Sequence, residues 1–296
     1  MTTRRDFLKT GAALGALSLL PAGFACSPSP KEKAIGLQLY SLRDDIQRDA
    51  AGTIKAAIAI GYKRLEFYGY QDGKFFGQTP KEMKQFLADL GAAMTGSHIN
   101  MSLLDPEADN TAQWGVWKKS IEDAAEAGCK WVVEAAYPVN QIESISDVMR
   151  LADQFNRCGE LVKAGGLRFA FHSQFGAFRD LDGQIPYDVL IVNTDKDLVT
   201  FQIDTEQMIY GSGIACHEYV KRYPGRFSNW HLKDAAPNGG STEFGKGIMD
   251  FEALFAVADI AKLEDYYVEQ EIYNMTPLES MKYNYDFLMN APYVKW

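Results

Sequence analysis

The stretch NWHLKDA, residues 229–235, combines an aromatic and an aliphatic residue with a histidine, a lysine and an aspartate. Side chains alternate across a β-strand, so Trp230 and Leu232 would share the face opposite to His231. A half-buried strand of this kind brings its ionisable residues to its carboxyl end. The pattern therefore predicts a strand that presents chemically active groups where it ends.

The same arrangement, an ionisable residue late in an apolar segment, recurs along the chain at His172, Asp204 and Glu269. If these groups converged with His231 and had no partner, burying their charges would be costly. A divalent cation removes that cost, and two imidazoles with two carboxylates suit Mn²⁺, Co²⁺, Zn²⁺ or Mg²⁺. The sequence thus predicts one divalent metal ion held by His172, Asp204, His231 and Glu269.

Further polar residues late in apolar segments are candidates for contacts with a substrate. We assign Gln38, Glu66 and His98 to substrate binding, and Glu134 occupies the corresponding place in the fourth segment. Each has a plain structural alternative, because a carboxylate or amide can cap a loop and a histidine can bond to a backbone carbonyl. Tyr137 is assigned to stacking on a sugar ring, with packing in the core as its alternative.

Eight short apolar or alternating segments can position these residues. They are 35–40, 63–68, 93–99, 130–135, 167–172, 198–204, 226–232 and 266–271. Helical periodicity between them, as in 80–90 and 117–127, supports alternating strands and helices, and Thr79 with Pro80 forms a helix start signal. Eight such units predict a (β/α)₈ TIM barrel with its active site at the carboxyl ends of the strands. A doubly wound open sheet is the alternative, but no glycine-rich phosphate loop follows the first segment.

The amino-terminal residues have the features of an export signal. Arg4 and Arg5 precede Phe-Leu-Lys and a short apolar run, which resembles a Tat-type signal. The run is too short for a stable membrane-spanning helix, which needs about 20 residues. We expect the signal to cover residues 1–25, a solvated tether to follow at 26–33, and Cys26 to be a possible lipid anchor. The expected location is the periplasm or, if lipidated, the membrane surface.

The remaining residues, 34–296, are expected to form one catalytic domain of a strongly acidic protein. Without residues 1–25 the chain keeps 27 basic and 38 acidic residues, a net charge of −11. Such a charge repels phosphate backbones, so nucleic acid is not an expected partner. Cys129, Cys158 and Cys216 lack metal-type spacing and are predicted to be buried small side chains.

Several of these segments together resemble one family. They are IGLQLYSLRD, GYKRLEFYGY, TGSHI, FQIDTEQM, NWHLKDA followed by FGKGIMDF, and YYVEQE. They are similar to the sugar phosphate isomerase/epimerase group of xylose isomerase-like barrels, over essentially all of residues 34–296. In that group the metal ligands at the ends of the fifth to eighth strands are typically Glu, Asp, His and Glu. Asp204, His231 and Glu269 match, whereas His172 stands where many epimerases have glutamate.

The resemblance implies a metal-dependent sugar isomerase or epimerase that removes a proton next to a keto-sugar carbonyl. It implies that Glu269 is ligand and base, that Glu271 or Glu134 returns the proton, and that Lys233 stabilises the oxyanion. For Lys233, a salt bridge to Asp234 is the alternative. Because the protein is exported, we expect a non-phosphorylated sugar as substrate.

Three other functions stay open at this point. The same enediolate chemistry in a 3-keto-glycoside lyase or hydratase would expel a substituent, and a non-catalytic sugar-binding lipoprotein would need no reaction. A barrel-type phosphodiesterase is disfavoured, because Gln207 stands where its family would require a histidine. The sequence leaves the oligomeric state undetermined.

Overall fold

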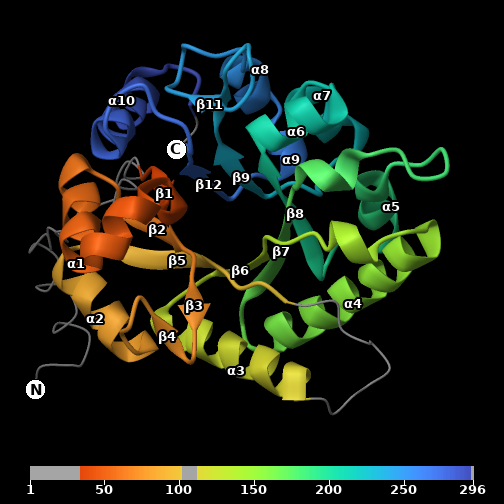
Figure 1. The fold of residues 1–296 in the computed structure, drawn as a ribbon, viewed down its shortest axis with the longest axis horizontal. Helices are drawn as coiled ribbons and strands as arrows, with labels where there is room; N and C mark the ends of the chain where they lie inside the picture. Colours follow the sequence, from red (N-terminus) through yellow and green to blue (C-terminus); the bar gives the residue numbers. More distant parts are fainter. Residues whose placement is uncertain (1–33, 102–111, 295–296) are drawn as a thin grey trace, which may run out of the picture. The chain divides into compact units, whose positions relative to one another are not determined.

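The computed structural model describes residues 34–101 and 112–294, and within them eight parallel strands close into a barrel (Figure 1). The strands are β1 (Gly36–Gln38), β2 (Arg64–Phe67), β5 (Ala93–His98), β6 (Trp131–Glu134), β7 (Arg168–His172), β8 (Val199–Asp204), β9 (Asn229–Leu232) and β12 (Asp265–Val268). Their order around the barrel is β1-β12-β9-β8-β7-β6-β5-β2, so each strand pairs with its neighbour in the chain and the last with the first. This confirms the predicted (β/α)₈ barrel. The expected signal and tether lie outside the described residues.

Helices follow the strands and surround the barrel (Figure 1). They are α1 (Arg43–Ile60), α2 (Pro80–Asp89), α3 (Ala112–Ala127), α4 (Ile145–Ala164), α5 (Pro186–Asn193), α6 (Thr205–Ser212), α7 (Cys216–Arg222), α8 (Phe251–Ala256), α9 (Ala258–Ala261) and α10 (Pro277–Asn290). The predicted start of α2 is confirmed: the Thr79 hydroxyl accepts from the Glu82 amide, the Glu82 carboxylate accepts from the Thr79 amide, and proline follows. Within the described residues, none of the helices combines the length and the apolar character that crossing a bilayer requires.

Strand alternation separates an apolar outer face from a more polar interior. Leu37, Phe171, Ile203 and Trp230 point outward and are fully buried in the main core beneath the helices. Each such side chain contributes roughly 1.5–3 kcal/mol relative to exposure. Cys129, Cys158 and Cys216 are also buried and unpaired, as predicted. Because the helices take up the apolar side chains, the other face of each strand is left for polar groups.

The two ends of the barrel carry different kinds of polar group. At the amino-terminal end the carboxylate of Asp265 accepts hydrogen bonds from Arg64, Lys130 and the indole of Trp131, at 2.5, 2.5 and 2.8 Å. These contacts tie β12, β2 and β6 together, a stabilising role typical of this end. The opposite end holds histidines and carboxylates from all around the barrel.

Short elements follow several strands at the carboxyl end. Antiparallel pairs form between β3 (Tyr70–Gln71) and β4 (Lys74–Phe75), and between β10 (Asp234–Ala235) and β11 (Ser241–Thr242). Three 3₁₀ turns follow β1, β6 and β7, at Leu39–Leu42, Val139–Gln141 and Phe175–Phe178. These segments build the mouth of the barrel around the site.

Candidate active site

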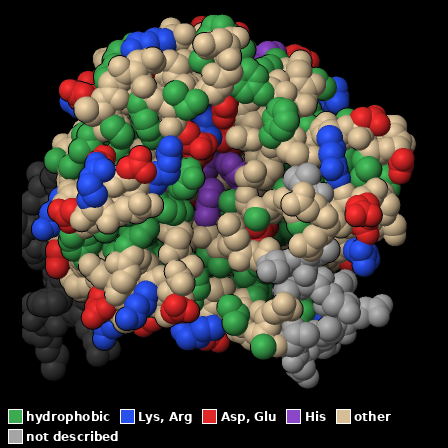
Figure 2. Space-filling model, in the orientation of Figure 1, with side chains coloured by type: hydrophobic (Ala, Val, Ile, Leu, Met, Phe, Trp, Pro, Cys, Tyr) green, Lys and Arg blue, Asp and Glu red, His purple; other side chains and the backbone are tan. Residues whose placement is uncertain are grey.

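The structure brings the four predicted metal ligands together at the mouth of the barrel. His172 ends β7, Asp204 ends β8, His231 lies in β9 and Glu269 directly follows β12. One donor atom of each lies within 4.8 Å of the others, and all four residues are buried. His231 Nδ1 is 2.7 Å from Glu269 Oε2, and His172 Nε2 is 3.6 Å from Asp204 Oδ2. Histidine side chains are visible in a hollow of the surface in Figure 2.

The donor set suits a divalent cation. Oδ1 of Asp204 caps α6 by accepting from the backbone amides of Glu206 and Gln207, at 2.9 and 3.0 Å. Oδ2 is buried and receives no well-aligned hydrogen bond from the described residues, although the ammonium of Lys233 lies 2.8 Å away. Asp204 is thus fixed through Oδ1, while Oδ2 faces the ammonium of Lys233 and the other residues of the cluster. Two nitrogens and two carboxylates fit metals of the kind the sequence predicts.

Beneath the cluster, Gln38, Glu66 and Gln202 form a layer that we call the polar floor. Nε2 of His231 contacts Glu66 Oε2, and Nδ1 of His172 lies 2.9 Å from Gln202 Oε1. Glu66 also accepts from Gln38 and Gln202, at 2.8 and 2.9 Å. Each histidine thus offers one nitrogen to the cluster and has the other held by the floor, the usual way in which proteins orient metal-binding histidines.

The charges of the floor and the cluster depend on each other. Burial by itself would raise the pKa of Glu66, but the neighbouring His231 and His98 lower it far below its usual range. Burial would likewise lower the pKa of His231, but Glu66 and Glu269 raise it to about 10. Without a metal ion, His231 is therefore an imidazolium between two carboxylates. A cation at this site would replace the proton on Nδ1.

Lys233 lies in the same buried cup. Its ammonium is 2.8 Å from Asp204 Oδ2, 2.7 Å from Glu271 Oε1, 3.4 Å from Glu269 Oε2 and 3.7 Å from Glu206 Oε2. Burial would lower the pKa of Lys233, but these carboxylates raise it well above its usual value. Burial raises the pKa of Glu206 to about 7. Lys233 is thus a buried cation shared by four carboxylates, and the alternative of a salt bridge to Asp234 is not observed.

Asp234 instead organises the glycine-rich loop that follows. Its Oδ2 accepts from the amides of Gly245 and Gly247, at 2.8 and 3.0 Å, and its Oδ1 accepts from Met249, at 3.1 Å. A Cβ on Gly247 would lie 2.1 Å from Asp234 Oδ1 and 2.4 Å from the carbonyl of Ala235, so only glycine fits there. The HLKD and GKG motifs are therefore two halves of one structural unit.

We predict that Asp234→Ala destabilises the protein by about 3 kcal/mol, because it removes one charged acceptor from three partly buried backbone hydrogen bonds. Urea unfolding followed by circular dichroism measures the free energy of unfolding, and limited proteolysis reports loosening of residues 239–249. Asp259→Ala, an exposed aspartate on α9, is the control for loss of a negative charge. Equal stability and equal protease resistance in D234A and D259A would contradict this role.

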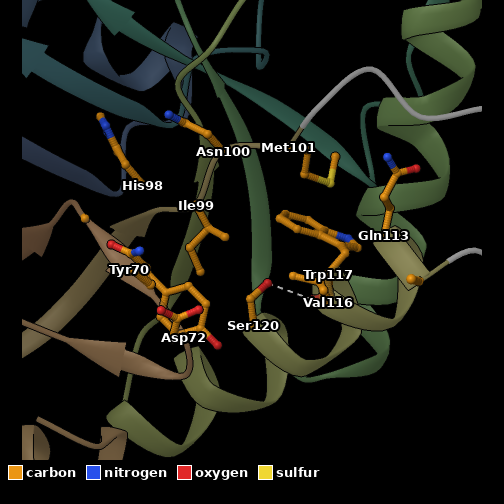
Figure 3. A pocket seen from close by; sticks show the side chains of 13 residues that line it. Tyr70, Asp72, His98, Ile99, Asn100, Met101, Gln113, Val116, Trp117 and Ser120 are labelled. Carbon is orange, nitrogen blue, oxygen red and sulfur yellow. Dashed lines mark hydrogen bonds between the residues drawn. The ribbon is translucent and has the colours of Figure 1, made fainter. Parts of the chain in front are cut away.

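His98 connects the cluster with a pocket. Its Nε2 lies 3.1 Å from Glu66 Oε2, and its ring is nearly parallel to that of His231, with centroids 5.3 Å apart. It also lines a cavity of about 480 Å³ beside the barrel mouth. In Figure 3, His98 lies at one edge of this cavity, and Trp117 and Gln113 of α3 lie across it. Among the expected substrate-binding residues, His98 is the one at the wall of this cavity.

The other expected substrate-binding and catalytic residues are placed differently. Gln38 and Glu66 are fully buried in the polar floor and are hydrogen-bonded to each other. Glu134 faces away from the barrel axis and accepts from the amides of Met101 and Ala136, at 2.6 and 2.7 Å. Burial raises its pKa to about 8. The structure thus places Gln38 and Glu66 in the polar floor and Glu134 on the outer face of β6, and their roles in substrate binding and proton transfer stay predictions.

Tyr137 also lies outside the cluster. It is buried, and its ring packs against Phe171 on the outer face of β7, with centroids 6.3 Å apart. These contacts are those of core packing, and its stacking on a sugar ring stays a prediction. Gln202 and Glu206, by contrast, were not selected from the sequence. The signal for Gln202 was its position two residues before Asp204, on the same face of the strand.

The fold and the site together define a class, (β/α)₈ barrels with a cluster of potential metal ligands at the carboxyl ends of their strands. The family described as xylose isomerase-like TIM barrel matches residues 54–291, and the chain belongs to this family. Residues 1–21 match the TAT (twin-arginine translocation) pathway signal sequence, which directs export across a membrane.

Several characterised proteins are similar to this chain. An inosose dehydratase of Clostridium perfringens is 30% identical over 150 residues, covering 44% of this chain and 50% of that protein. The chain thus spans about half the length of the first curated relatives that it matches. An inosose dehydratase of Geobacillus thermodenitrificans is 23% identical over 270 residues, covering 79% and 88%.

Among solved structures, a sugar phosphate isomerase/epimerase from Parabacteroides distasonis is 28% identical. The match covers 93% of this chain and 100% of that one, with a TM-score of 0.80. The predicted fold, family and export signal are confirmed. By their names, the proteins similar to this chain are inosose dehydratases and a sugar phosphate isomerase/epimerase.

Proposed function

We propose that the protein is a metal-dependent sugar isomerase or epimerase that abstracts a proton from the carbon next to a keto-sugar carbonyl. The observation that carries this proposal is the convergence of His172, Asp204, His231 and Glu269 within 4.8 Å at the barrel mouth. A bound divalent cation, Mn²⁺, Co²⁺, Zn²⁺ or Mg²⁺, would polarise the carbonyl and stabilise the negative charge that develops on its oxygen.

The residues around the cation position supply the proton transfers. Burial alone would raise the pKa of Glu269, but Lys233 and His231 lower it well below its usual range, so the carboxylate is ionised and can accept a proton. The ammonium of Lys233, 3.4 Å from Glu269, donates to the developing oxyanion. Glu271 forms an ion pair with Lys233, and the Glu271 side chain is 37% exposed. This exposure suits a group that exchanges protons with solvent.

The pocket beside His98 is the proposed binding site for the sugar. Its volume of about 480 Å³ lies in the range of small-molecule sites. His98 and Asn100 offer hydrogen-bonding groups to hydroxyls, and Trp117 offers an apolar surface. None of the described residues that line it is lysine or arginine, and Asp72 is acidic, so a neutral sugar fits better than a sugar phosphate.

An elimination is the second candidate reaction. The similarity to inosose dehydratases favours it, because the same carbanion can expel a hydroxyl or glycosyl group from the adjacent carbon. The substrate would then be a 3-keto-glycoside or a related keto-sugar. A non-catalytic sugar-binding lipoprotein is the alternative from another class. We further propose signal cleavage near residue 25, a tether at 26–33 and, if Cys26 is lipidated, anchoring at the membrane surface.

Metal analysis followed by solvent-deuterium exchange tests these candidates. The mature protein is expected to hold about one divalent ion and to incorporate deuterium into ketohexoses or 3-keto-glucosides, and the product distinguishes isomerisation, epimerisation and elimination. The variant His231→Ala is expected to lose the exchange while its circular dichroism spectrum stays native. A metal-free protein that binds sugar without exchange would favour the binding lipoprotein.

A further inference from the structure

The ammonium of Lys233 contacts two of the four residues of the proposed metal site. It lies 2.8 Å from Asp204 Oδ2 and 3.4 Å from Glu269 Oε2, and both carboxylates belong to the four-residue cluster. The Lys233 side chain is only 1% exposed, so in this conformation its ammonium interacts with the carboxylates and not with bulk water. The same two carboxylates therefore face two cationic partners, one built into the chain and one exchangeable.

The charge balance of the cup makes these partners competitors. Four carboxylates, those of Asp204, Glu206, Glu269 and Glu271, surround the single ammonium. A dication bound to Asp204 and Glu269 would be repelled by the ammonium and would compete with it for the same carboxylate oxygens. Glu206 and Glu271 oppose this effect, because they attract the ammonium away from the ligand carboxylates.

We propose that Lys233 is an internal competitor that weakens metal binding and keeps the metal ion exchangeable, an inference that rests on the proposed metal site. Glu206 is a positioning residue in this arrangement, since it lies outside the ligand cluster and acts through Lys233. The two residues therefore have opposite effects on the affinity for metal. Removing the ammonium tightens binding, and removing Glu206 loosens it.

The test is a titration of the metal-free mature protein with Mn²⁺ at one fixed pH. Isothermal calorimetry and the electron paramagnetic resonance signal of free Mn²⁺ measure the dissociation constant. Lys233→Met is expected to bind Mn²⁺ on the order of 100-fold more tightly than wild type. Glu206→Gln is expected to bind about tenfold more weakly.

Lys246→Met is the matched control. It removes the same charge from a lysine that pairs with Glu243, at 3.3 Å, and is 40% exposed. Its affinity for Mn²⁺ is expected to equal that of wild type. If K246M tightened binding as much as K233M, net charge alone would explain the effect and the inference would fail.

The remaining outcomes separate this inference from the proposed function. Binding by K233M that is equal to or weaker than wild type overturns the competitor role and leaves the metal site intact. Mn²⁺ binding by K233M alone supports the competitor role, whereas no binding by either protein overturns both proposals. If K233M does not fold, as judged by circular dichroism, E206Q decides, and unchanged or tighter binding in E206Q overturns the inference.

Discussion

Glu269→Gln is expected to reduce solvent-deuterium exchange into the keto-sugar by about 10³-fold or more. The amide cannot accept the proton that the carboxylate takes, and a positioned general base typically contributes about 10²–10⁴ to a rate. The substitution also removes a negative charge 2.7 Å from His231 Nδ1, which weakens the cluster itself. The measurement is deuterium incorporation by nuclear magnetic resonance, with the metal content determined in the same preparation.

Two comparisons make this experiment specific. Glu264→Gln changes the same residue type just before the start of β12, where Glu264 pairs with Lys130 at 2.9 Å, and exchange should remain at the wild-type rate. Metal content separates two causes, because loss of exchange with normal metal identifies the base and loss of both identifies the ligand. Exchange within tenfold of wild type in a fully metal-loaded E269Q protein would rule out Glu269 as the base.

The convergence of the four cluster residues was predictable because two simple regularities combine. Side chains two apart on a strand share a face, and parallel strands in a closed barrel end at one rim. His172 on β7 and Asp204 on β8 therefore had to come close once their segments were recognised as strands. No knowledge of packing was needed for this step, since strand period and strand order suffice.

The orientation of Glu134, which points away from the barrel axis, has a particular cause. In β6 the axis-facing positions hold Trp131 and Val133, which form a small apolar cluster with Ala170 inside the barrel. The rule that the polar residue of a strand faces the axis fails in β6, because its apolar residues point inward and Glu134 points outward. The sequence of a strand that is apolar on both faces does not reveal which face meets the axis.

Depth within the barrel was the second property that the sequence could not supply. Glu66 has the predicted inward face, yet it lies below the cluster because Gly96 on the adjacent β5 leaves room for it. A Cβ on Gly96 would lie 2.9 Å from Glu66 Oε1. The level of each residue depends on the stagger of neighbouring strands, which strand period alone does not give.

Glu66→Gln is expected to destabilise the metal-free protein by about 3 kcal/mol and to weaken metal binding about 10- to 100-fold. Glu66 accepts on both oxygens, from Gln38, Gln202 and His231, so an amide in its place puts a donor against a donor. Removing the charge of Glu66 also leaves the buried positive charge of His231 balanced by Glu269 alone. Thermal unfolding should show a decrease in Tm of about 5–6 °C for a chain of this size.

The pH dependence gives this prediction a sign that a general loss of packing would not reproduce. Because the pKa of Glu66 is lowered on folding, its charge stabilises the fold above the unfolded value of 4.5. This stabilisation is lost as the pH falls below that value. Because the pKa of His231 is raised on folding, its protonated ring contributes its full stabilisation below the unfolded value of 6.5. This stabilisation is lost as the pH rises toward about 10. The difference in free energy of unfolding between wild type and E66Q should therefore be largest between about pH 4.5 and 6.5.

Denaturant unfolding of the metal-free proteins from pH 4.5 to pH 9.5 measures this difference directly. Glu122→Gln, on an exposed position of α3, is the matched control and should change stability by no more than about 0.5 kcal/mol at any pH. A difference between wild type and E66Q that stays constant from pH 5 to pH 9.5 would mean that shape, and not the buried charge of Glu66 against the His231 imidazolium, holds the floor together. In that case the floor would still orient the two histidines, but through hydrogen bonds whose strength does not depend on the charge of the ring.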